Sequence, residues 1–529
     1  PAIFVAPAPS PCRGTICQEH GTVTVWVLGD CLSRRGPLAD HPDEAVLMIE
    51  AREFARKLPY HPHKLTLVFA AMRHHRDELR AEGREVQYRH AKTFGDGLDA
   101  HLEAHPGDDL TLARPASDRA AERLRGMVEE RGGTLAFAPN PTVLSTADQF
   151  DAWTDGPPFT HETFYRAIRR ETTYLIDDGE PVGGEWNYDD QNREPPPDGY
   201  DPPDPPAFDP DDTTREVIEW VETEFSGGYD EPPYGGDWAD PAPFRWPVTR
   251  EDAEEALDAF VANRLSDFGA YQDAMVAGER TGHHSLLSAA LNLGLLHPDE
   301  VVERAIAAYE AGDAPLNSVE GFVRQVIGWR EFMRHVYNET APEIRTANRL
   351  HATEDLPEFY WTGETYMACM SDCVAGVRQQ GYSHHIQRLM ILSNFALTYG
   401  VDPARLDRWF HAAYVDAYDW VTTPNVVEMG LYAHGAFATK PYAASANYVD
   451  EMSDYCDGCP YDPDATTGEA ACPFNALYWE FLDRNEDELR SNHRMGLVYH
   501  HLDGKDESER TAIRERAAEV RSLAEAGEL

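Results

Sequence analysis

Lysine is nearly absent from this sequence of 529 residues. The only lysines are Lys57, Lys64, Lys92, Lys440 and Lys505, and every other basic side chain is an arginine. Acidic residues outnumber basic ones by 93 to 46, which gives a formal net charge of -47. Dense counterions screen the self-repulsion of such a surface at high salt. The composition therefore predicts the protein of a halophile and says little about its partner.

Long apolar runs and frequent cysteine are also missing. No stretch of eighteen apolar residues occurs, so a membrane-spanning helix is not expected. Residues 1–7 (PAIFVAP) lack the basic and apolar regions of a secretory signal. Eight cysteines are too few for a disulfide scaffold in a chain of this length. We expect a cytoplasmic protein. Its 42% apolar content and its length exclude global disorder and favour two or more domains.

The N-terminal part alternates between strand-like and helix-like segments. Residues 21–29 (GTVTVWVLG) form a β-branched run that ends at Gly-Asp, and residues 45–50 and 65–70 repeat that pattern. Residues 71–83 are typical of a helix. The alternation predicts an α/β domain with a mostly parallel sheet over residues 1–145.

The composition changes twice after this domain. Residues 177–236 are rich in proline and aspartate, which predicts a connector over residues 146–245 in which 213–225 is helical. From residue 246 to 529 no strand-like alternation returns, so we expect one large all-helical domain. Thr249, with Asp252 three residues later, predicts one helix start, and Asp402-Pro403 predicts another.

Cysteine spacing gives the sharpest local signal. Cys456 and Cys459 are separated by two residues, and Cys472-Pro473 follows after twelve more. Two such thiolates hold one metal centre, and a third closes the site. The fourth ligand must come from elsewhere, and Cys369 and Cys373 are both available. The pattern alone fits an iron–sulfur cluster or zinc, and either centre could be purely structural.

Other polar residues support more than one interpretation. Of the adjacent histidines His384 and His385, one could face a cavity and act as a general acid, or both could be satisfied interior histidines. Ser285 and Ser288 could offer hydroxyls to phosphates. Aromatic residues are dense in residues 361–448, where such rings ordinarily pack in a core.

Together these motifs resemble one family. They are GD-x-LS, YQDAM, S-x-x-S, GWREF, YWTGET-x-MAC, GY-x-HHIQRLM, ATKPY and C-x-x-C followed by ACPF, in this order from Val23 to about Leu482. The set is similar to the photolyase/cryptochrome superfamily, in particular its iron–sulfur branch, the prokaryotic (6-4) photolyases. The resemblance implies a Rossmann-like antenna domain, a long connector and a helical domain that binds FAD.

The resemblance also implies roles for individual residues. It gives Cys369, Cys456, Cys459 and Cys472 to a 4Fe-4S cluster, with Cys373 in reserve. For FAD, it gives Ser285, Ser288, Arg330, Arg388, Asp416 and Asp419. The group that faces the reactive flavin nitrogen is left open between Thr422 and Asn425.

For the damaged base, the family pattern implies His384, His385, Tyr442 and Tyr448. It implies that Trp409 and Trp361 belong to an electron relay, in which Phe410 occupies a position where a tyrosine would carry an intermediate step. Gly29, Asp30 and Glu50 would contact a lumazine antenna (6,7-dimethyl-8-ribityllumazine), although Cys31 stands where a glutamine is expected.

The implied function is light-driven repair of (6-4) photoproducts in UV-damaged DNA by a monomeric lyase. Excited reduced flavin would donate an electron to the flipped-out lesion, and a histidine would donate a proton. A photoreceptor with the same cofactors is the alternative, and a nucleic-acid-binding module with a structural metal is a third possibility.

DNA binding requires positive charge near the phosphates, in conflict with the overall charge. We therefore expect an arginine-rich island around the flavin cavity that includes Arg378, Arg388 and Lys440.

Overall fold

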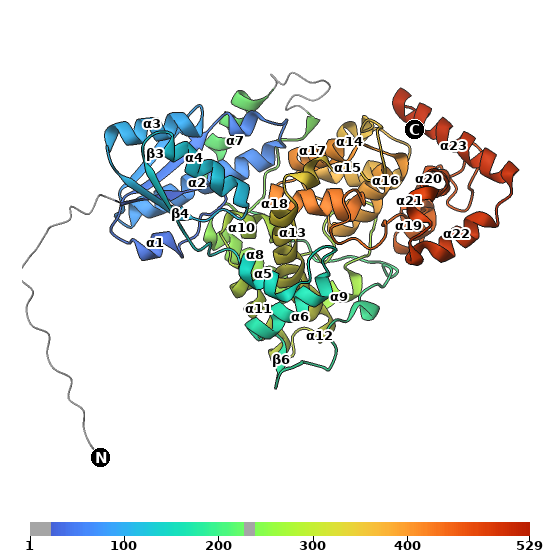
Figure 1. The fold of residues 1–529 in the computed structure, drawn as a ribbon, viewed down its shortest axis with the longest axis horizontal. Coiled ribbons are helices and arrows are strands. Elements are labelled where there is room, and N and C mark those ends of the chain that lie inside the picture. Colours follow the sequence, from blue (N-terminus) through green and yellow to red (C-terminus); the bar gives the residue numbers. More distant parts are fainter. Residues whose placement is uncertain (1–22, 227–237) are drawn as a thin grey trace, which may run out of the picture.

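The computed structural model describes residues 23–226 and 238–529. An α/β unit is followed by a large helical part, and the C-terminal helices lie at the far end from the sheet (Figure 1). The segment 1–7 and part of the predicted connector lie outside the described residues. None of the helices in the two described ranges combines the length and apolar content needed to cross a bilayer.

Five parallel strands form the sheet of the α/β unit, as the sequence predicted. They are β1 (Val23–Val27), β2 (Val46–Ala51), β3 (Val86–Ala91), β4 (Asp109–Ala113) and β5 (Thr134–Ala138), in the order β3-β2-β1-β4-β5. The chain therefore reverses its direction of winding between β1 and β4. In open parallel sheets, ligands bind at the carboxyl ends of the strands beside such a reversal.

Helices cover both faces of this sheet, because successive side chains of a strand point to opposite faces and both sets are apolar. Val25 and Val27 share a buried cluster with residues of α2 (Pro62–Ala81), whereas Trp26 belongs to a second cluster. That second cluster includes residues of α3 (Phe94–Ala104) and α4 (Asp118–Glu129). The short α1 (Pro37–Asp40) contributes Leu38 to the first cluster.

The strand predicted at residues 65–70 is wrong. This segment lies inside α2, which begins after His61, whose side chain accepts a hydrogen bond from the His63 amide. Pro62 occupies the first turn, where its fixed φ favours a helix. The buried residues Leu65, Phe69 and Met72 follow helical spacing. A local apolar run therefore resembled a strand because the periodicity of the longer segment was missed.

The described part of the connector contains several short elements whose apolar residues join the main buried cluster. It contains α5 (Ala147–Trp153), α6 (His161–Thr172), the two-residue strands β6 (Ile176–Asp177) and β7 (Glu180–Pro181), η2 (Asp189–Gln191) and α7 (Asp212–Phe225). The helix predicted at residues 213–225 is confirmed by α7. It packs on α2, where the Phe69 and Trp220 ring centroids are 5.0 Å apart.

The remainder is helical, as predicted, and the described residues from 247 onward contain no named strand. Its elements are α8 (Arg250–Asn263), α9 (Leu265–Tyr271), α10 (Ser288–Leu293), α11 (Pro298–Ala311), α12 (Leu316–Val323), η4 (Arg324–Arg330), α13 (Glu331–Thr340), η5 (Glu343–Thr346), α14 (Phe359–Thr362), α15 (Ala368–Gln380), η6 (Gln387–Ser393), α16 (Asn394–Tyr399), α17 (Pro403–Ala413), α18 (Asp419–Thr423), η7 (Pro424–Gly430), α19 (Ala446–Met452), η8 (Tyr455–Gly458), α20 (Pro473–Arg484), α21 (Glu486–Leu489), η9 (His493–Met495), α22 (Gly496–Asp503) and α23 (Glu507–Ala526).

Both helix starts predicted from capping residues are confirmed. Thr249 accepts a hydrogen bond from the Asp252 amide at the start of α8, and Asp402 accepts one from the Ala404 amide before α17. Three segments, η4, η6 and η7, are π-helical. Such wide turns are rare and occur often at functional sites.

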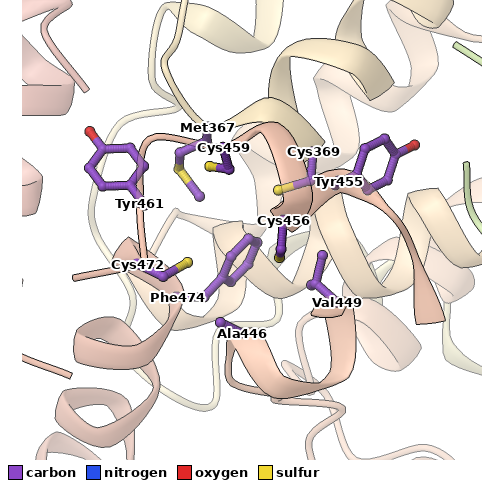
Figure 2. A pocket seen from close by; sticks show the side chains of 10 residues that line it. All are labelled: Met367, Cys369, Ala446, Val449, Tyr455, Cys456, Cys459, Tyr461, Cys472 and Phe474. Atoms are coloured by element: carbon purple, nitrogen blue, oxygen red, sulfur yellow. The ribbon is translucent and has the colours of Figure 1, made fainter. Parts of the chain in front are cut away.

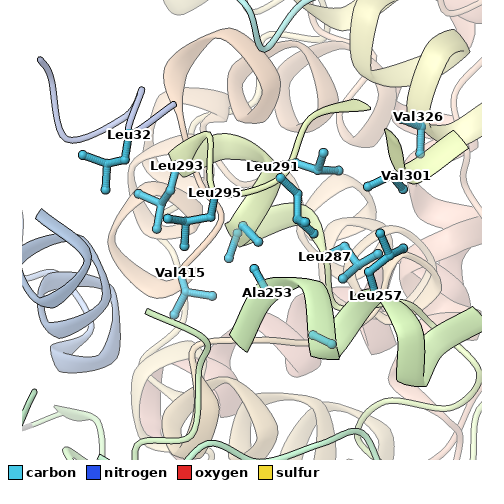
Figure 3. Packing of buried hydrophobic residues seen from close by; sticks show 14 of the residues in the cluster. Leu32, Ala253, Leu257, Leu287, Leu291, Leu293, Leu295, Val301, Val326 and Val415 are labelled. Atoms are coloured by element: carbon cyan, nitrogen blue, oxygen red, sulfur yellow. The ribbon is translucent and has the colours of Figure 1, made fainter. Parts of the chain in front are cut away.

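One apolar core joins the α/β unit to the helical part. Leu32, just after β1, lies in the same cluster as Leu293, Leu295 and Val415 (Figure 3). The Leu32 amide also donates to the Leu293 carbonyl at 2.7 Å. The carboxyl edge of β1 therefore packs directly against α10, where the sequence places the candidate phosphate-binding serine Ser288.

Candidate functional site

Four cysteines from three separate segments line one pocket. Cys369 lies in the first turn of α15, Cys456 in η8 with Cys459 just after it, and Cys472 caps α20. The pocket encloses about 320 Å³ of unfilled space, part of it open to solvent. Figure 2 shows the cysteine side chains distributed around this space, with Phe474 and Val449 on its wall. Cys373 is not among the lining residues; its sulfur lies 4.0 Å from the Tyr455 hydroxyl.

The cysteines are unpaired and spread apart. None of the six described cysteines forms a disulfide. No group of three or more His, Cys, Asp or Glu side chains in the described part lies close enough together to hold a single metal ion. Burial raises the pKa of Cys456 and Cys472 to about 12, so both are protonated unless a metal centre displaces the protons.

A second cluster joins Arg388, Asp416 and Ser288. The Arg388 guanidinium donates to both Asp416 carboxylate oxygens at 3.1 Å, and the Ser288 hydroxyl donates to the same carboxylate at 2.7 Å. Burial opposes ionisation of Asp416, but the Arg388 charge outweighs it and lowers the pKa of this carboxyl. The Tyr414 ring lies under the guanidinium, with its centroid 4.1 Å away. Segments far apart in sequence thus meet at one charged site.

Arg330 and Asp419 lie outside this cluster. Arg330 donates to the Thr142 carbonyl at 2.8 Å, and its guanidinium lies 5.0 Å from the centroid of the Trp420 ring. Asp419 pairs with Arg345 at 3.1 Å. The structure therefore brings together only Ser288, Arg388 and Asp416 among the predicted flavin residues. Ser285 lies three residues before α10 begins and is partly exposed.

Thr422 and Asn425, the two alternatives for the flavin-facing group, differ in whether their polar atoms are already hydrogen-bonded within the protein. The Asn425 amide donates to the Val421 carbonyl at 2.7 Å, so its nitrogen is already used within the helix. Thr422 is 9% exposed. The structure gives neither residue a contact to the Arg388 cluster in the described hydrogen bonds.

The adjacent histidines occupy different environments. His384 is buried and its ring stacks on His284, with centroids 4.7 Å apart. His385 is solvent-exposed. Loss of solvation by the surrounding protein, and then the nearby Arg388 charge, lower the pKa of His385 below its ordinary value. Burial also lowers the pKa of His384 well below its ordinary value. Both rings are therefore neutral at pH 7.

His384 also has an unsatisfied polar atom. Its Nδ1 is buried without a hydrogen-bond partner among the described residues. Such atoms are uncommon in folded proteins and call for a water, ligand or catalytic explanation. The His284 stack was not predictable from the sequence, although His283-His284 immediately precede the predicted serines.

A short hydrogen-bond chain links His384 to the wall of the cysteine pocket. The His384 amide donates to Gln387 Oε1 at 3.1 Å, and Gln387 Nε2 donates to the Tyr455 hydroxyl at 3.1 Å. That hydroxyl donates to Asp372 at 3.1 Å. Tyr455 also lines the cysteine pocket (Figure 2). Sequence reasoning missed this link because Gln387 and Tyr455 carry no recognisable spacing.

Tyr442 and Tyr448 follow a loop, residues 434–438, whose backbone amides bind one buried carboxylate. Glu428, completely buried in η7, accepts hydrogen bonds from the amides of His434, Gly435, Phe437 and Ala438. Tyr442 is 39% exposed and Tyr448 is partly buried. Burial raises the pKa of both hydroxyls, and Arg193 opposes that rise at each. The two tyrosines therefore share one neighbour.

The two tryptophans predicted to form the relay lie edge to face. The Trp361 and Trp409 ring centroids lie 6.5 Å apart at 86°. Phe410 stacks on Tyr414 instead of lying between them, with centroids 5.0 Å apart. Because the two indoles already meet, a tyrosine at position 410 is not needed to bridge them.

The predicted antenna residues separate into two groups. Gly29 and Asp30 follow β1 at the edge where the sheet order reverses. Cys31 there lines a cavity of about 290 Å³ with Val27 and Leu112. None of Gly29, Asp30 and Glu50 lines this cavity, although Gly29 and Asp30 lie between its lining residues Leu28 and Cys31 in the sequence. The buried Glu50 carboxylate accepts hydrogen bonds from Arg73, Tyr88 and His90, and, although burial opposes it, these lower its pKa to about 2.

Two of the three basic residues predicted to contact DNA serve the fold. Arg378 donates to the backbone carbonyls of Trp238 and Thr362, so its guanidinium fastens the connector to the helical part. Arg388 forms an ion pair with Asp416. Lys440 is exposed. The arginine island stays a prediction, and in it Arg378 would also have a structural role through its two backbone carbonyls.

Comparison with known proteins agrees with this arrangement. Residues 25–232 match the family model described as "Deoxyribodipyrimidine photo-lyase-related protein". The chain is 42% identical over 505 residues to a (6-4) photolyase of Agrobacterium fabrum, covering 93% of this chain and 98% of that protein.

Solved structures share the fold at low identity. A bacterial class III photolyase from Agrobacterium tumefaciens aligns over 97% of this chain and 100% of its own, with a TM-score of 0.61 and 15% identity. A Synechocystis cryptochrome aligns over 88% of this chain and 90% of its own, with a TM-score of 0.55 and 13% identity. The extent and identity of the Agrobacterium fabrum match decide the assignment: the chain belongs to the deoxyribodipyrimidine photolyase-related family of the photolyase/cryptochrome superfamily.

Proposed function

We propose that this protein is a light-driven DNA lyase that reverses pyrimidine (6-4) photoproducts. The observation that carries the proposal is the 42% identity to a (6-4) photolyase over nearly the full length of both chains. Because the alignment spans nearly all of both proteins, the similarity applies to the whole molecule and not to a single shared domain. UV-damaged DNA is then the partner, and we propose a monomer with units at residues 1–145, 146–245 and 246–529.

The residues around Arg388 fit an FAD site. When bound, FAD supplies the light-driven transfer of one electron into the lesion. Asp416 and the Ser383 carbonyl fix the Arg388 guanidinium through three hydrogen bonds, and its two other N–H groups are proposed to bind an anionic part of the cofactor. Ser285 and Ser288 are the candidate phosphate partners. Arg330 and Asp419, which lie apart from this cluster, serve the proposal less well.

His384 and His385 supply the proton in this proposal. Both are neutral in the free protein because burial and Arg388 disfavour the charged form. A histidine that donates a proton must therefore become protonated when DNA binds. The negative phosphates of the DNA would raise its pKa and so favour the protonated form. His385, the accessible ring, receives the proton, while stacked His384 and its unpartnered Nδ1 hold the lesion. Tyr442 and Tyr448 line the approach.

The cysteine pocket fits a 4Fe-4S cluster better than zinc. Tetrahedral zinc at a Zn–S distance of about 2.3 Å would draw the four sulfurs to within about 4 Å of one another. The described side chains do not converge that closely, and they surround a space of about 320 Å³. A cluster with its own iron and sulfide atoms occupies such a space. We assign Cys369, Cys456, Cys459 and Cys472 as its ligands.

We also propose a lumazine-type antenna at the cavity beside Gly29 and Asp30. The reversal of strand order and the cavity of about 290 Å³ support this location. Glu50 is not a convincing contact because the protein's own donors surround its carboxylate.

The test is an absorption spectrum of anaerobically purified protein in high salt, followed by illumination with DNA that contains a (6-4) photoproduct. We expect flavin bands, broad iron–sulfur absorbance and light-dependent loss of the near-ultraviolet band of the lesion. Flavin photoreduction without lesion loss would instead identify a photoreceptor. A protein without flavin would contradict the proposal.

A matched pair of variants sharpens this test. Asp416→Asn removes the charge that fixes Arg388 and should reduce flavin content strongly. Asp419→Asn changes an equivalent carboxylate that pairs with Arg345 at the surface, and flavin content should stay near that of the wild type. Equal flavin loss in both would argue against the Arg388 cluster as the cofactor site.

A further inference from the structure

A third indole touches the Trp409–Trp361 pair. The Trp238 and Trp361 ring centroids are 5.0 Å apart at 83°, which is closer than the 6.5 Å between Trp361 and Trp409. Trp238 belongs to the connector and is 6% exposed. Three tryptophans from three distant parts of the sequence therefore form one continuous line of edge-to-face contacts.

This third contact is held in place from several sides. The Trp238 indole N–H donates to the Pro59 carbonyl at 2.9 Å, and the neutral His61 ring packs against the indole with centroids 5.5 Å apart. Arg378 donates both to the Trp238 carbonyl and to the Thr362 carbonyl, next to Trp361. One guanidinium thus clamps the backbones of both tryptophans, so their contact is a fixed feature of the packing.

We propose that Trp238 is a further electron-relay residue, which extends the path Trp409–Trp361 by one step. The inference rests on the proposed flavin function. Trp409 gives one electron to the photoexcited oxidised flavin and regains it from Trp361, which regains it from Trp238. A soluble thiol then returns one electron to the Trp361–Trp238 pair and loses its own proton, and two such oxidised thiols combine as a disulfide. Partly exposed Trp361 gives that thiol access to the pair.

The physical benefit of the added step is separation of charge. Electron transfer weakens steeply with distance, so a positive charge moved from Trp409 to Trp238 recombines more slowly with the reduced flavin. The hydrogen bond from the indole N–H to Pro59 favours the oxidised ring, because it draws the proton away from the developing positive charge.

The experiment is time-resolved absorption of the flavin-loaded protein with a soluble thiol, comparing wild type, Trp238→Phe and Trp246→Phe. Trp246 is a matched control: it lies just after the end of the connector, is 8% exposed and also donates its indole N–H to a backbone carbonyl, that of Gln380. We expect Trp238→Phe to shorten the life of the separated charges and to lower the yield of reduced flavin several-fold. Trp246→Phe should match the wild type.

Two further measurements exclude a merely structural effect. In flavin-free protein, the Trp238–Trp361 contact should give an exciton pair in the far-ultraviolet circular dichroism that Trp238→Phe removes and Trp246→Phe retains. Protein whose flavin is reduced chemically should repair DNA at the wild-type rate in all three forms. Trp238→Tyr, which retains an oxidisable ring, should recover part of the photoreduction yield.

The outcomes separate this inference from the proposed function. Equal photoreduction in Trp238→Phe and wild type would overturn the relay role of Trp238, whatever the repair activity. Equal impairment in Trp238→Phe and Trp246→Phe would overturn it as well, since loss of any buried tryptophan near this part of the chain would then suffice. Normal photoreduction with no repair by the chemically reduced wild type would contradict the lyase and leave the relay standing.

Discussion

Glu428 and the four-cysteine pocket are both buried collections of polar groups, and they differ in what completes them. Glu428 accepts four backbone hydrogen bonds from its own chain and needs nothing further. The cysteines surround unfilled space and make no disulfide within the described residues. Buried polar groups in folded proteins are normally satisfied. A buried polar cluster whose hydrogen bonds all come from the chain itself therefore belongs to the scaffold. A cluster that surrounds unfilled space is a candidate ligand site.

The largest effect should follow from removing one cysteine ligand. Cys456→Ser should abolish the broad iron–sulfur absorbance and greatly lower the yield of folded protein, since binding of a structural metal is coupled to folding. Absorption spectra and iron content measure this. Cys373→Ser changes a more deeply buried thiol outside the pocket and should retain the absorbance. The reverse result would give the fourth ligand to Cys373.

A smaller effect is expected where the scaffold carboxylate is changed. Glu428→Gln leaves at least one buried amide N–H without an acceptor, which should lower the free energy of unfolding by about 2 kcal/mol. Urea unfolding in high salt measures it, with exposed Glu222→Gln as the control. Loss of flavin at unchanged stability would mean that Glu428 belongs to the site and not to the scaffold.

The link between the two kinds of region gives a third prediction. Tyr455→Phe keeps the ring in the pocket wall and removes the hydroxyl that joins Gln387 to Asp372. Iron content should be unchanged, while repair slows several-fold because the His384 backbone loses support. Tyr461→Phe, which changes another wall residue without that link, is the control. Equal repair rates in both would remove the coupling.

The smallest effect concerns pH. Burial lowers the pKa of His284 to about 3 and that of His385 to about 4, below the ordinary value of 6.5. At pH values between the folded-state pKa and 6.5, the unfolded chain binds more protons than the folded one. The free energy of unfolding therefore falls as the pH drops below about 6.5. His385→Gln should make this decline shallower. Unfolding midpoints at several pH values test it, and an unchanged slope would show that His385 titrates normally.

Much of the fold was predictable from local sequence. The alternation of strands and helices, the capping residues Thr249 and Asp402 and the connector helix all have short-range signals. The segment at residues 65–70 was misassigned because a short, mostly apolar run fits either periodicity. Within the site, the cysteine spacing was informative, whereas Gln387–Tyr455 and Trp238–Trp361 arise only from tertiary packing. No local sequence pattern predicts contacts between residues so far apart in the chain.

The separation of Arg330 and Asp419 from Arg388 has the same origin. Family motifs assign residues to a pocket by position along the chain, and tertiary pairing decides where their charges go. Arg330 meets the Thr142 carbonyl and Asp419 meets Arg345, partners that lie far from them in sequence. Arg388 meets Asp416 instead.

The π-helical segments have a consequence for anyone who would rebuild this scaffold. Arg330 ends η4, Arg388 lies in η6 and Glu428 lies in η7. A π-turn holds one more residue than an α-turn, and each α-helical residue turns the chain by about 100°. A redesign that regularised η6 into an ideal α-helix would therefore rotate Arg388 relative to the residues beyond the segment and separate it from Asp416. The irregular turns fix the angular position of these side chains, and idealised geometry would retain the fold while losing the site.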